Sequence, residues 1–292
     1  MENVVTISNL SSENISEYCA PGTKWTEQMV SVSDNVSLRV IEFHPHKKTT
    51  QPTVLFIAGW ISLMKGWKLV LQEMTKDFNI IYVETREKIS SQVNGTKDFS
   101  VKAIATDLVK LVEIFGLQKN KYIMFGSSLG GTAILESYKD LEKLPLCFVL
   151  LGPNAEYRAP WWWLIIIHLF WTRLYAILKP FVKWYLRKFR LDIESDLAQY
   201  EKYCNALDAA DPKKLKPGAL ALAKYKVWDI LENIDLPVLI IGASKDLLHE
   251  PQNLIQIDKM LPNSTFLDME TNTFAHGPEL VEEIRKYIAS LK

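Results

Sequence analysis

The sequence predicts an α/β fold built on about eight mostly parallel strands, with helices on both faces of the sheet. Two observations predict it. Short apolar runs rich in β-branched residues alternate along the chain with longer segments whose apolar residues recur at helical spacing. Strands that alternate with helices form parallel sheets, since each helix returns the chain to the edge where the next strand begins.

The expected strands follow from their apolar runs. A first hairpin is expected at 24–31 and 36–43, because Asp34-Asn35 supplies a turn between two alternating segments. The later runs have the composition of buried strands. They are expected at 54–58, 79–83, 122–125, 148–151, 238–241 and 265–269.

The expected helices are amphipathic. Residues 100–115 are the clearest example, since Ile104, Leu108 and Leu111 lie on one apolar stripe and Gly116 ends the segment. The other helices are expected at 63–76, 130–141, 253–260 and 278–291.

The alternation of strands and helices stops between residues 154 and 230. This break indicates a largely helical insertion after the sixth strand. We therefore expect three parts: an N-terminal arm (1–22), a core (23–153 and 226–292) and a helical cap (154–225).

Composition argues against several classes of function. Hydrophobic residues make up 48% of the chain and charged residues 23%, which is typical of a folded protein with a sizeable core. The formal net charge is +0, so we expect no nucleic-acid partner. Cys19, Cys147 and Cys204 form no CxxC pair, which argues against a zinc or redox site. The cysteines and a polar N-terminus unlike a signal peptide favour a cytoplasmic location.

A nucleophile motif lies between an expected strand and an expected helix. Gly126-Ser127-Ser128-Leu129-Gly130 matches G-x-S-x-G. Small residues two positions before and after the central serine let the backbones pass closely at a sharp turn. Such a turn exposes the hydroxyl beside a helix N-terminus, which favours negative charge. We therefore expect Ser128 to be a nucleophile rather than part of a glycine-rich turn without chemistry.

With this motif, the sequence resembles the α/β-hydrolase superfamily over most of residues 24–292, apart from the insertion. The resemblance implies an acid after a later strand and a histidine after the last one. Asp246 follows the strand 238–241, and His276 precedes the last helix. An aspartate bonded to imidazole holds the tautomer that activates a serine. The expected triad is therefore Ser128, His276 and Asp246.

Two residues compete for these roles. Glu156 follows the sixth strand, where some family members place the acid, and is the alternative acid. His249 lies three residues after Asp246 and is the alternative base.

The resemblance also implies an oxyanion hole made by two backbone N–H groups. One is that of Leu129, directly after the nucleophile, and the other is that of Trp60, after the strand 54–58. Family members commonly carry His-Gly at this loop, whereas this chain has Ala58-Gly59. The change leaves the second donor open, and Trp60 is also a candidate wall of the acyl pocket.

The insertion is rich in aromatic and basic residues. Residues 157–191 hold eleven aromatic and seven basic residues and no acidic one. Pro180 is expected to divide two helical segments. An apolar cap favours an apolar substrate, because pockets are lined to match what they desolvate. The tryptophans expected to line this pocket are Trp161, Trp162, Trp163 and Trp171.

The second segment of the insertion is predicted to be amphipathic, with one cationic and one aromatic stripe, which suits a membrane surface. A transmembrane span is the less favoured alternative, because the apolar run before Arg173 has about 11 residues and a span needs ~20. The residues expected to face a membrane are Lys179, Lys183, Arg187 and Arg190.

The expected function is a serine hydrolase that cleaves carboxylic esters or thioesters of hydrophobic, lipid-like acyl groups through an acyl-enzyme. No metal and no organic cofactor is expected. The expected partners are a small hydrophobic ester and a peripheral membrane contact through the cap. Two alternatives stay open: an acyltransferase with the same triad, and a non-catalytic lipid-binding or membrane-recruited module, which Ala58 would suit.

Overall fold

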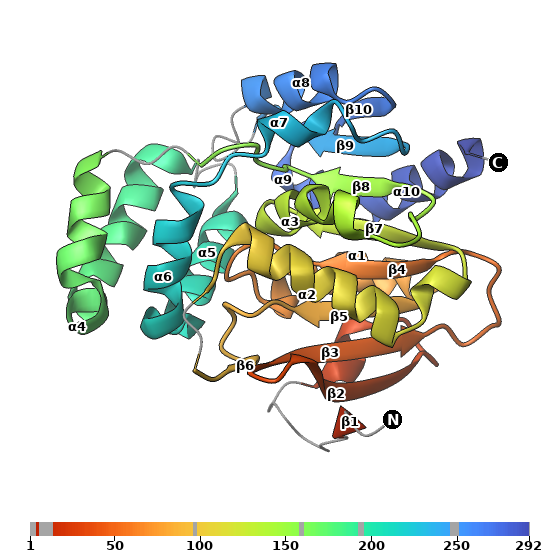
Figure 1. Ribbon diagram of the computed structural model, residues 1–292, viewed down its shortest axis with the longest axis horizontal. Helices are drawn as coiled ribbons and strands as arrows, with labels where there is room; N and C mark the ends of the chain where they lie inside the picture. Colours follow the sequence, from red (N-terminus) through yellow and green to blue (C-terminus); the bar gives the residue numbers. More distant parts are fainter. Residues whose placement is uncertain are drawn as a thin grey trace.

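The structure is a computed structural model of the 292-residue chain. It describes residues 4–5, 14–95, 98–157, 161–191, 196–245 and 251–291. Figure 1 shows one twisted sheet between two layers of helices, with a separate group of helices at one end of the molecule.

The described strands form one ten-stranded sheet in the order β1-β2-β3-β5-β4-β7-β8-β9-β10, with β6 paired to β3. Neighbours from β5 to β10 are parallel, whereas β1, β2, β3 and β6 pair antiparallel. The predicted fold class is confirmed. The strands are β1 (Val4–Val5), β2 (Lys24–Ser33), β3 (Val36–His44), β4 (Thr53–Ile57), β5 (Ile80–Glu84), β6 (Gln92–Val93), β7 (Tyr122–Ser127), β8 (Phe148–Leu151), β9 (Val238–Gly242) and β10 (Ser264–Asp268).

The parallel strands are apolar throughout because both faces of the sheet are buried. In β4, Val54 and Phe56 point into one core cluster, while Leu55 and Ile57 point into the other. All four side chains are fully buried. This explains why the sequence shows continuous apolar runs here rather than alternation.

Helices cover each face of the sheet. Apolar residues of α2, α3 and α8 pack in one core cluster, and those of α1 and α10 pack in the other. Short helical segments join these elements. The bounds are η1 (Ile15–Tyr18), η2 (Met64–Trp67), α1 (Lys68–Met74), α2 (Val101–Ile114), η3 (Leu117–Lys119), α3 (Leu129–Ser137), η4 (Tyr138–Asp140), α7 (Trp228–Leu231), α8 (Pro251–Met260), α9 (Asn272–Ala275) and α10 (Pro278–Ser290).

The segment expected as an N-terminal arm is partly packed onto the core. β1 pairs with β2 at the edge of the sheet. Ile15 and Tyr18 of η1 are buried in the same cluster as α1. Ala20 N–H donates to Thr75 Oγ1 at 2.8 Å, which fixes this segment against the end of α1.

The helices inserted after β8 lie beside the sheet, at the left of Figure 1. They are α4 (Trp161–Tyr185), the π-helical turn η5 (Leu186–Arg190), α5 (Leu197–Ala209) and α6 (Pro212–Leu222). A small apolar cluster joins α4 to α6 through Ile167, Tyr175 and Leu215. We call this group of helices the cap.

The prediction that Pro180 divides two helices is wrong, because α4 runs through it from Trp161 to Tyr185. A proline inside a helix removes one hydrogen bond and costs about 3 kcal/mol. Packing of the opposite face offsets this cost: Ile167 and Tyr175 are buried, and Tyr175 Oη donates to Leu207 O at 2.6 Å. Among the helices in the described part of the chain, none is long and apolar enough to cross a membrane.

Candidate active site

Ser128 lies on a strained turn between β7 and α3. Its backbone has φ 48° and ψ −115°, a conformation that L-residues rarely adopt. The flanking glycines make the turn feasible. A Cβ on Gly126 would come within 2.6 Å of Gly131 N, and one on Gly130 would lie 2.9 Å from the carbonyl carbon of Ile57. This is the geometry that the G-x-S-x-G motif predicts for a nucleophile.

The loop after β4 passes beside Ser128. A Cβ added to Gly59 would lie 3.4 Å from Ser128 Cβ, so this loop and the turn are in direct contact. Ile61 has a positive φ of 50°, which marks a second strained position in this loop. Within the described residues, neither Trp60 N–H nor Leu129 N–H donates a hydrogen bond. An oxyanion hole made by these two groups stays a prediction from the sequence.

His276 follows α9, in the loop between β10 and α10. Its Nδ1 lies 3.0 Å from the carbonyl oxygen of Asn272. A carbonyl oxygen only accepts, so this bond places the proton of the neutral ring on Nδ1 and leaves the lone pair on Nε2. The ring also packs on buried Trp67, with centroids 4.6 Å apart. These contacts fix both the tautomer and the plane of the imidazole.

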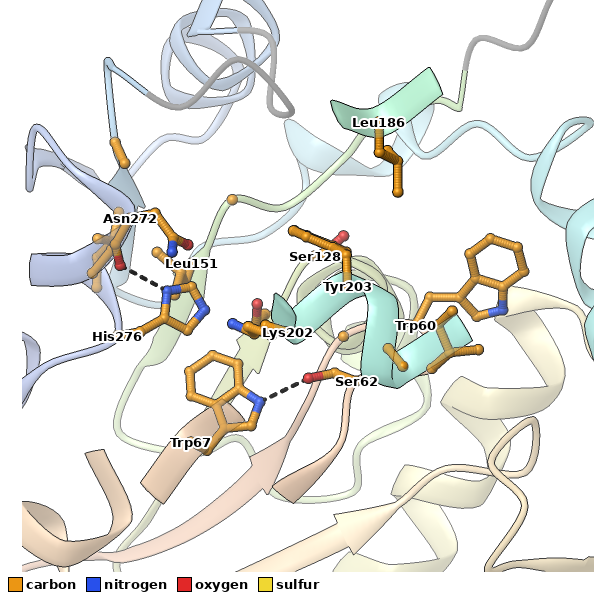
Figure 2. Close-up of a pocket in the computed structure, with 18 of the residues that line it drawn as sticks. Trp60, Ser62, Trp67, Ser128, Leu151, Leu186, Lys202, Tyr203, Asn272 and His276 are labelled. Atoms are coloured by element: carbon orange, nitrogen blue, oxygen red, sulfur yellow. Dashed lines mark hydrogen bonds between the residues drawn. The ribbon is translucent and has the colours of Figure 1, made fainter. Parts of the chain in front are cut away.

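Ser128 and His276 border one cavity of about 260 Å³. Figure 2 shows both side chains in this cavity, with His276 bonded to the Asn272 carbonyl and Trp60 on another part of the wall. The floor comes from the ends of β4, β7, β8 and β9, and the cap supplies further lining. Most of these side chains are apolar, including Leu151, Leu186, Leu207, Ile241 and Leu254.

The two remaining triad candidates of the sequence, Asp246 and His249, lie outside the described residues. The chain leading to them is tied to the loop that carries His276. Lys245 N–H donates to Glu270 O at 2.8 Å, and Lys245 Nζ pairs with the Glu270 carboxylate at 2.8 Å. The alternative acid, Glu156, pairs instead with Lys226 Nζ at 3.3 Å and is not among the residues that line the cavity.

The structure shows a cluster of polar side chains in contact with Ser128 that the sequence did not predict. Asn154 Nδ2 donates to Ser128 Oγ at 3.2 Å. Thr132 Oγ1 donates to Asn154 O at 2.8 Å and lies 3.3 Å from Tyr157 Oη. Burial raises the pKa of Tyr157 to about 12, so this hydroxyl stays protonated near neutral pH. Asn154 follows the carboxyl end of β8, a position that the parallel sheet already marks as a candidate for chemistry.

The structure describes the side chains of only some of the predicted cap residues. The side chains of Trp161, Trp162, Trp163 and Trp171 lie outside the described part of the structure, as does that of Arg190. Lys179 and Lys183 each lie 2.8 Å from the Asp208 carboxylate on α5. Their ammonium groups lower the pKa of Asp208. Two residues of the expected cationic stripe are therefore paired within the cap. Among the stripe residues whose side chains the structure describes, Arg187 is the exposed one.

An exposed aromatic cluster lies at the end of α4 and on η5. Phe181, Trp184, Tyr185 and Phe189 are all exposed. Their rings contact one another, with centroids 5.5 to 5.7 Å apart for the three pairs Phe181–Trp184, Trp184–Phe189 and Tyr185–Phe189. We call these four residues the aromatic cluster. Leu186, in the same turn, lines the cavity that holds Ser128. The four residues of the aromatic cluster are not among the described residues that line this cavity.

No protein-family model matches this sequence, and no curated protein matches it. The sheet order, the strained serine turn and the cap define the α/β-hydrolase fold, and solved structures agree. An esterase from Thermogutta terrifontis has 18% identity and a TM-score of 0.72, over 92% of this chain and 99% of that chain. An enol-lactonase from Burkholderia xenovorans LB400 has 13% identity and a TM-score of 0.72, over 89% and 98%. A hydrolase from Pseudomonas aeruginosa PA01 has 14% identity and a TM-score of 0.71, over 91% and 97%.

Proposed function

We propose that this protein is a serine hydrolase that cleaves carboxylic esters or thioesters of hydrophobic acyl groups. The observation that carries the proposal is the placement of Ser128 and His276 on one largely apolar cavity, with the serine on a strained turn. An apolar cavity beside a nucleophile suits an acyl chain, because burial of the chain contributes binding free energy. The esterase and the enol-lactonase named above are similar in fold and support ester chemistry.

The reaction follows from the placement of the groups. His276 Nε2 takes the hydroxyl proton as Ser128 Oγ attacks the carbonyl carbon, and the N–H groups of Trp60 and Leu129 stabilise the oxyanion. The carbon–oxygen bond to the leaving group then breaks, and His276 returns the proton to that oxygen. Water, deprotonated by His276, attacks the acyl-enzyme and releases the acid and free Ser128. Asp246 is proposed to orient the imidazole together with the Asn272 carbonyl.

A fluorophosphonate probe tests the nucleophile. We expect it to label the wild-type protein and not Ser128→Ala, and we expect p-nitrophenyl esters of medium acyl length to be hydrolysed faster than the acetate. Ser127→Ala is the matched control, because Ser127 is the neighbouring hydroxyl of the same turn. No labelling of any variant would instead support a non-catalytic lipid-binding module. Esters formed from an added alcohol in place of the free acid would support the acyltransferase.

Asp246→Asn tests the acid. An asparagine lacks the negative charge that stabilises the imidazolium formed during the reaction, so we expect kcat to fall by about 10³-fold or more with the melting temperature little changed. Steady-state kinetics on a soluble ester give the value. Full activity in this variant, with a loss in Glu156→Gln, would move the acid role to Glu156.

The membrane contact is proposed to depend on the aromatic cluster, with Arg187 adding attraction to anionic lipid. Trp184→Glu and Phe189→Glu should each weaken sedimentation with vesicles containing anionic lipid by about tenfold, because each change removes an apolar side chain that would be half buried in lipid. Lys213→Gln, on the exposed surface of α6, is the charge-matched control, because it also lowers the net charge by one. Equal sedimentation of all variants would rule out this contact.

A further inference from the structure

Two cavities meet at His276. The first, of about 260 Å³, is the one that holds Ser128. The second, of about 320 Å³, lies between η2, the first turns of α5 and the loop that carries His276. His276, Asn272 and Lys202 line both cavities, whereas Ser128 lines the first of them. The imidazole therefore lies at the junction between the two spaces.

The two cavities differ in chemistry. Among the described residues that line the first, Lys202 is the only one with a permanent charge. The second is lined largely by charged and amide side chains. These are Lys65, Lys68, Asp196, Gln199, Glu201, Lys202, Asn205 and Asn272, and Thr273 adds a hydroxyl. The exposed walls of both cavities are mostly apolar, so the charged groups distinguish the second cavity, which suits a group that combines an apolar part with a charged one.

The proposed reaction requires one space for the acyl chain and another for the leaving alcohol. The imidazole that deprotonates Ser128 must later protonate the oxygen of the leaving group. The leaving alcohol must therefore lie next to His276, on the side away from the acyl chain. Among the described residues, the second cavity provides a space next to His276 outside the first.

Lys202 reaches this junction from the cap. Its Nζ lies 5.1 Å from the ring centroid of Trp67, and Trp67 packs on His276. The lysine stem crosses η2 at Gly66, where a Cβ would lie only 2.8 Å from Lys202 Cε. The absence of a side chain at residue 66 therefore lets the ammonium group lie within reach of a leaving group.

The other charged residues that line the second cavity do not line the first. Asp196 caps α5 by accepting from Gln199 N–H at 2.9 Å, and it also accepts from Asn272 Nδ2 at 3.3 Å. Lys68 pairs with Glu17 at 3.2 Å. Lys65 and Glu201 are exposed at the rim. Lys202 is the cation that lines both cavities.

We infer that the second cavity binds the alcohol half of the ester, and that Lys202 selects an alcohol bearing an anionic group, a carboxylate or a phosphate, close to the ester oxygen. This inference rests on the proposed hydrolase function. It predicts a substrate with one apolar end and one anionic end, rather than an ester that is apolar throughout. An ammonium group on a partly desolvated wall favours such an anion more strongly than an exposed lysine does.

A matched pair of substrates tests this inference: the decanoyl ester of 3-hydroxypropanoate, and the same compound with its carboxylate methylated. For the wild type, we expect kcat/KM to be about tenfold higher for the anionic ester. Lys202→Met should reduce this ratio to about one, and Lys202→Arg should keep it above one, since the charge remains. Lys213→Met is a control of the same type on α6, outside both cavities, and should keep the wild-type ratio.

The ratio of kcat/KM for the anionic ester to kcat/KM for the methylated ester distinguishes anion binding by Lys202 from a structural role. If Lys202 acted only on the fold or on His276, Lys202→Met would change both rates equally and leave the ratio unchanged, which would overturn the inference. A wild-type ratio near one would also overturn it. Failure of the hydrolase function has a different signature: neither ester is cleaved, and the fluorophosphonate probe does not label Ser128.

Discussion

Exchange of His276 for alanine should lower kcat by about 10⁵-fold for any ester that the wild type cleaves. In the proposed mechanism the imidazole performs both proton transfers, so its loss would remove the base for attack and the acid for departure. The bond between Nδ1 and the Asn272 carbonyl already holds Nε2 in the basic form, so the wild type loses little activity to the wrong tautomer. Steady-state and burst kinetics with a p-nitrophenyl ester give the measurement.

Two controls keep this prediction specific. His276 packs on Trp67, so its removal also affects packing. His276→Asn fills more of the space, and thermal melting of both variants separates unfolding from loss of catalysis. His44→Ala removes an exposed histidine bonded to Asn79 at 3.1 Å, and it should remain fully active. If His249→Ala lost activity and His276→Ala kept it, the base would be His249.

The fold was predictable because burial leaves a pattern in consecutive residues. All eight expected strands are present, since each is an alternating segment or an apolar run long enough to be distinguished from a turn. β1 and β6 were not predicted, because two-residue strands have no periodicity. Pro180 was misread for a related reason. A local rule predicts a break, but contacts with α5 and α6 hold the helix together.

The sequence predicts a site residue only where the neighbouring residues in the chain determine its backbone geometry. The Ser128 turn is encoded in five consecutive residues, and the two glycines allow the close backbone contacts that this turn requires. By contrast, Asn154 contacts Ser128 across 26 positions, and Lys183 meets Asp208 across 25 positions. No local pattern predicts such pairs, because they depend on how the cap helices pack.

The second large effect concerns stability. Gly130→Ala should destabilise the protein by about 3 kcal/mol or more, which corresponds to a fall in melting temperature of about 10 °C. The new Cβ would collide with the backbone carbonyl of Ile57 in β4, and a buried strand cannot move away without disturbing its neighbours. Thermal or urea unfolding measures the change.

Gly218→Ala is the matched control, because Gly218 is a buried helical glycine whose added Cβ would make only ordinary contacts, the nearest at 3.6 Å. It should be neutral or stabilising by about 0.5–1 kcal/mol, since alanine favours helices more than glycine does. Any Gly130→Ala protein that still folds should also hydrolyse esters more slowly than the wild type. Ile57 is followed by Ala58, Gly59 and Trp60, so a displaced Ile57 carbonyl moves the proposed oxyanion donor relative to Ser128. A stable and fully active Gly130→Ala variant would show that the turn is not as tightly packed as the steric argument requires.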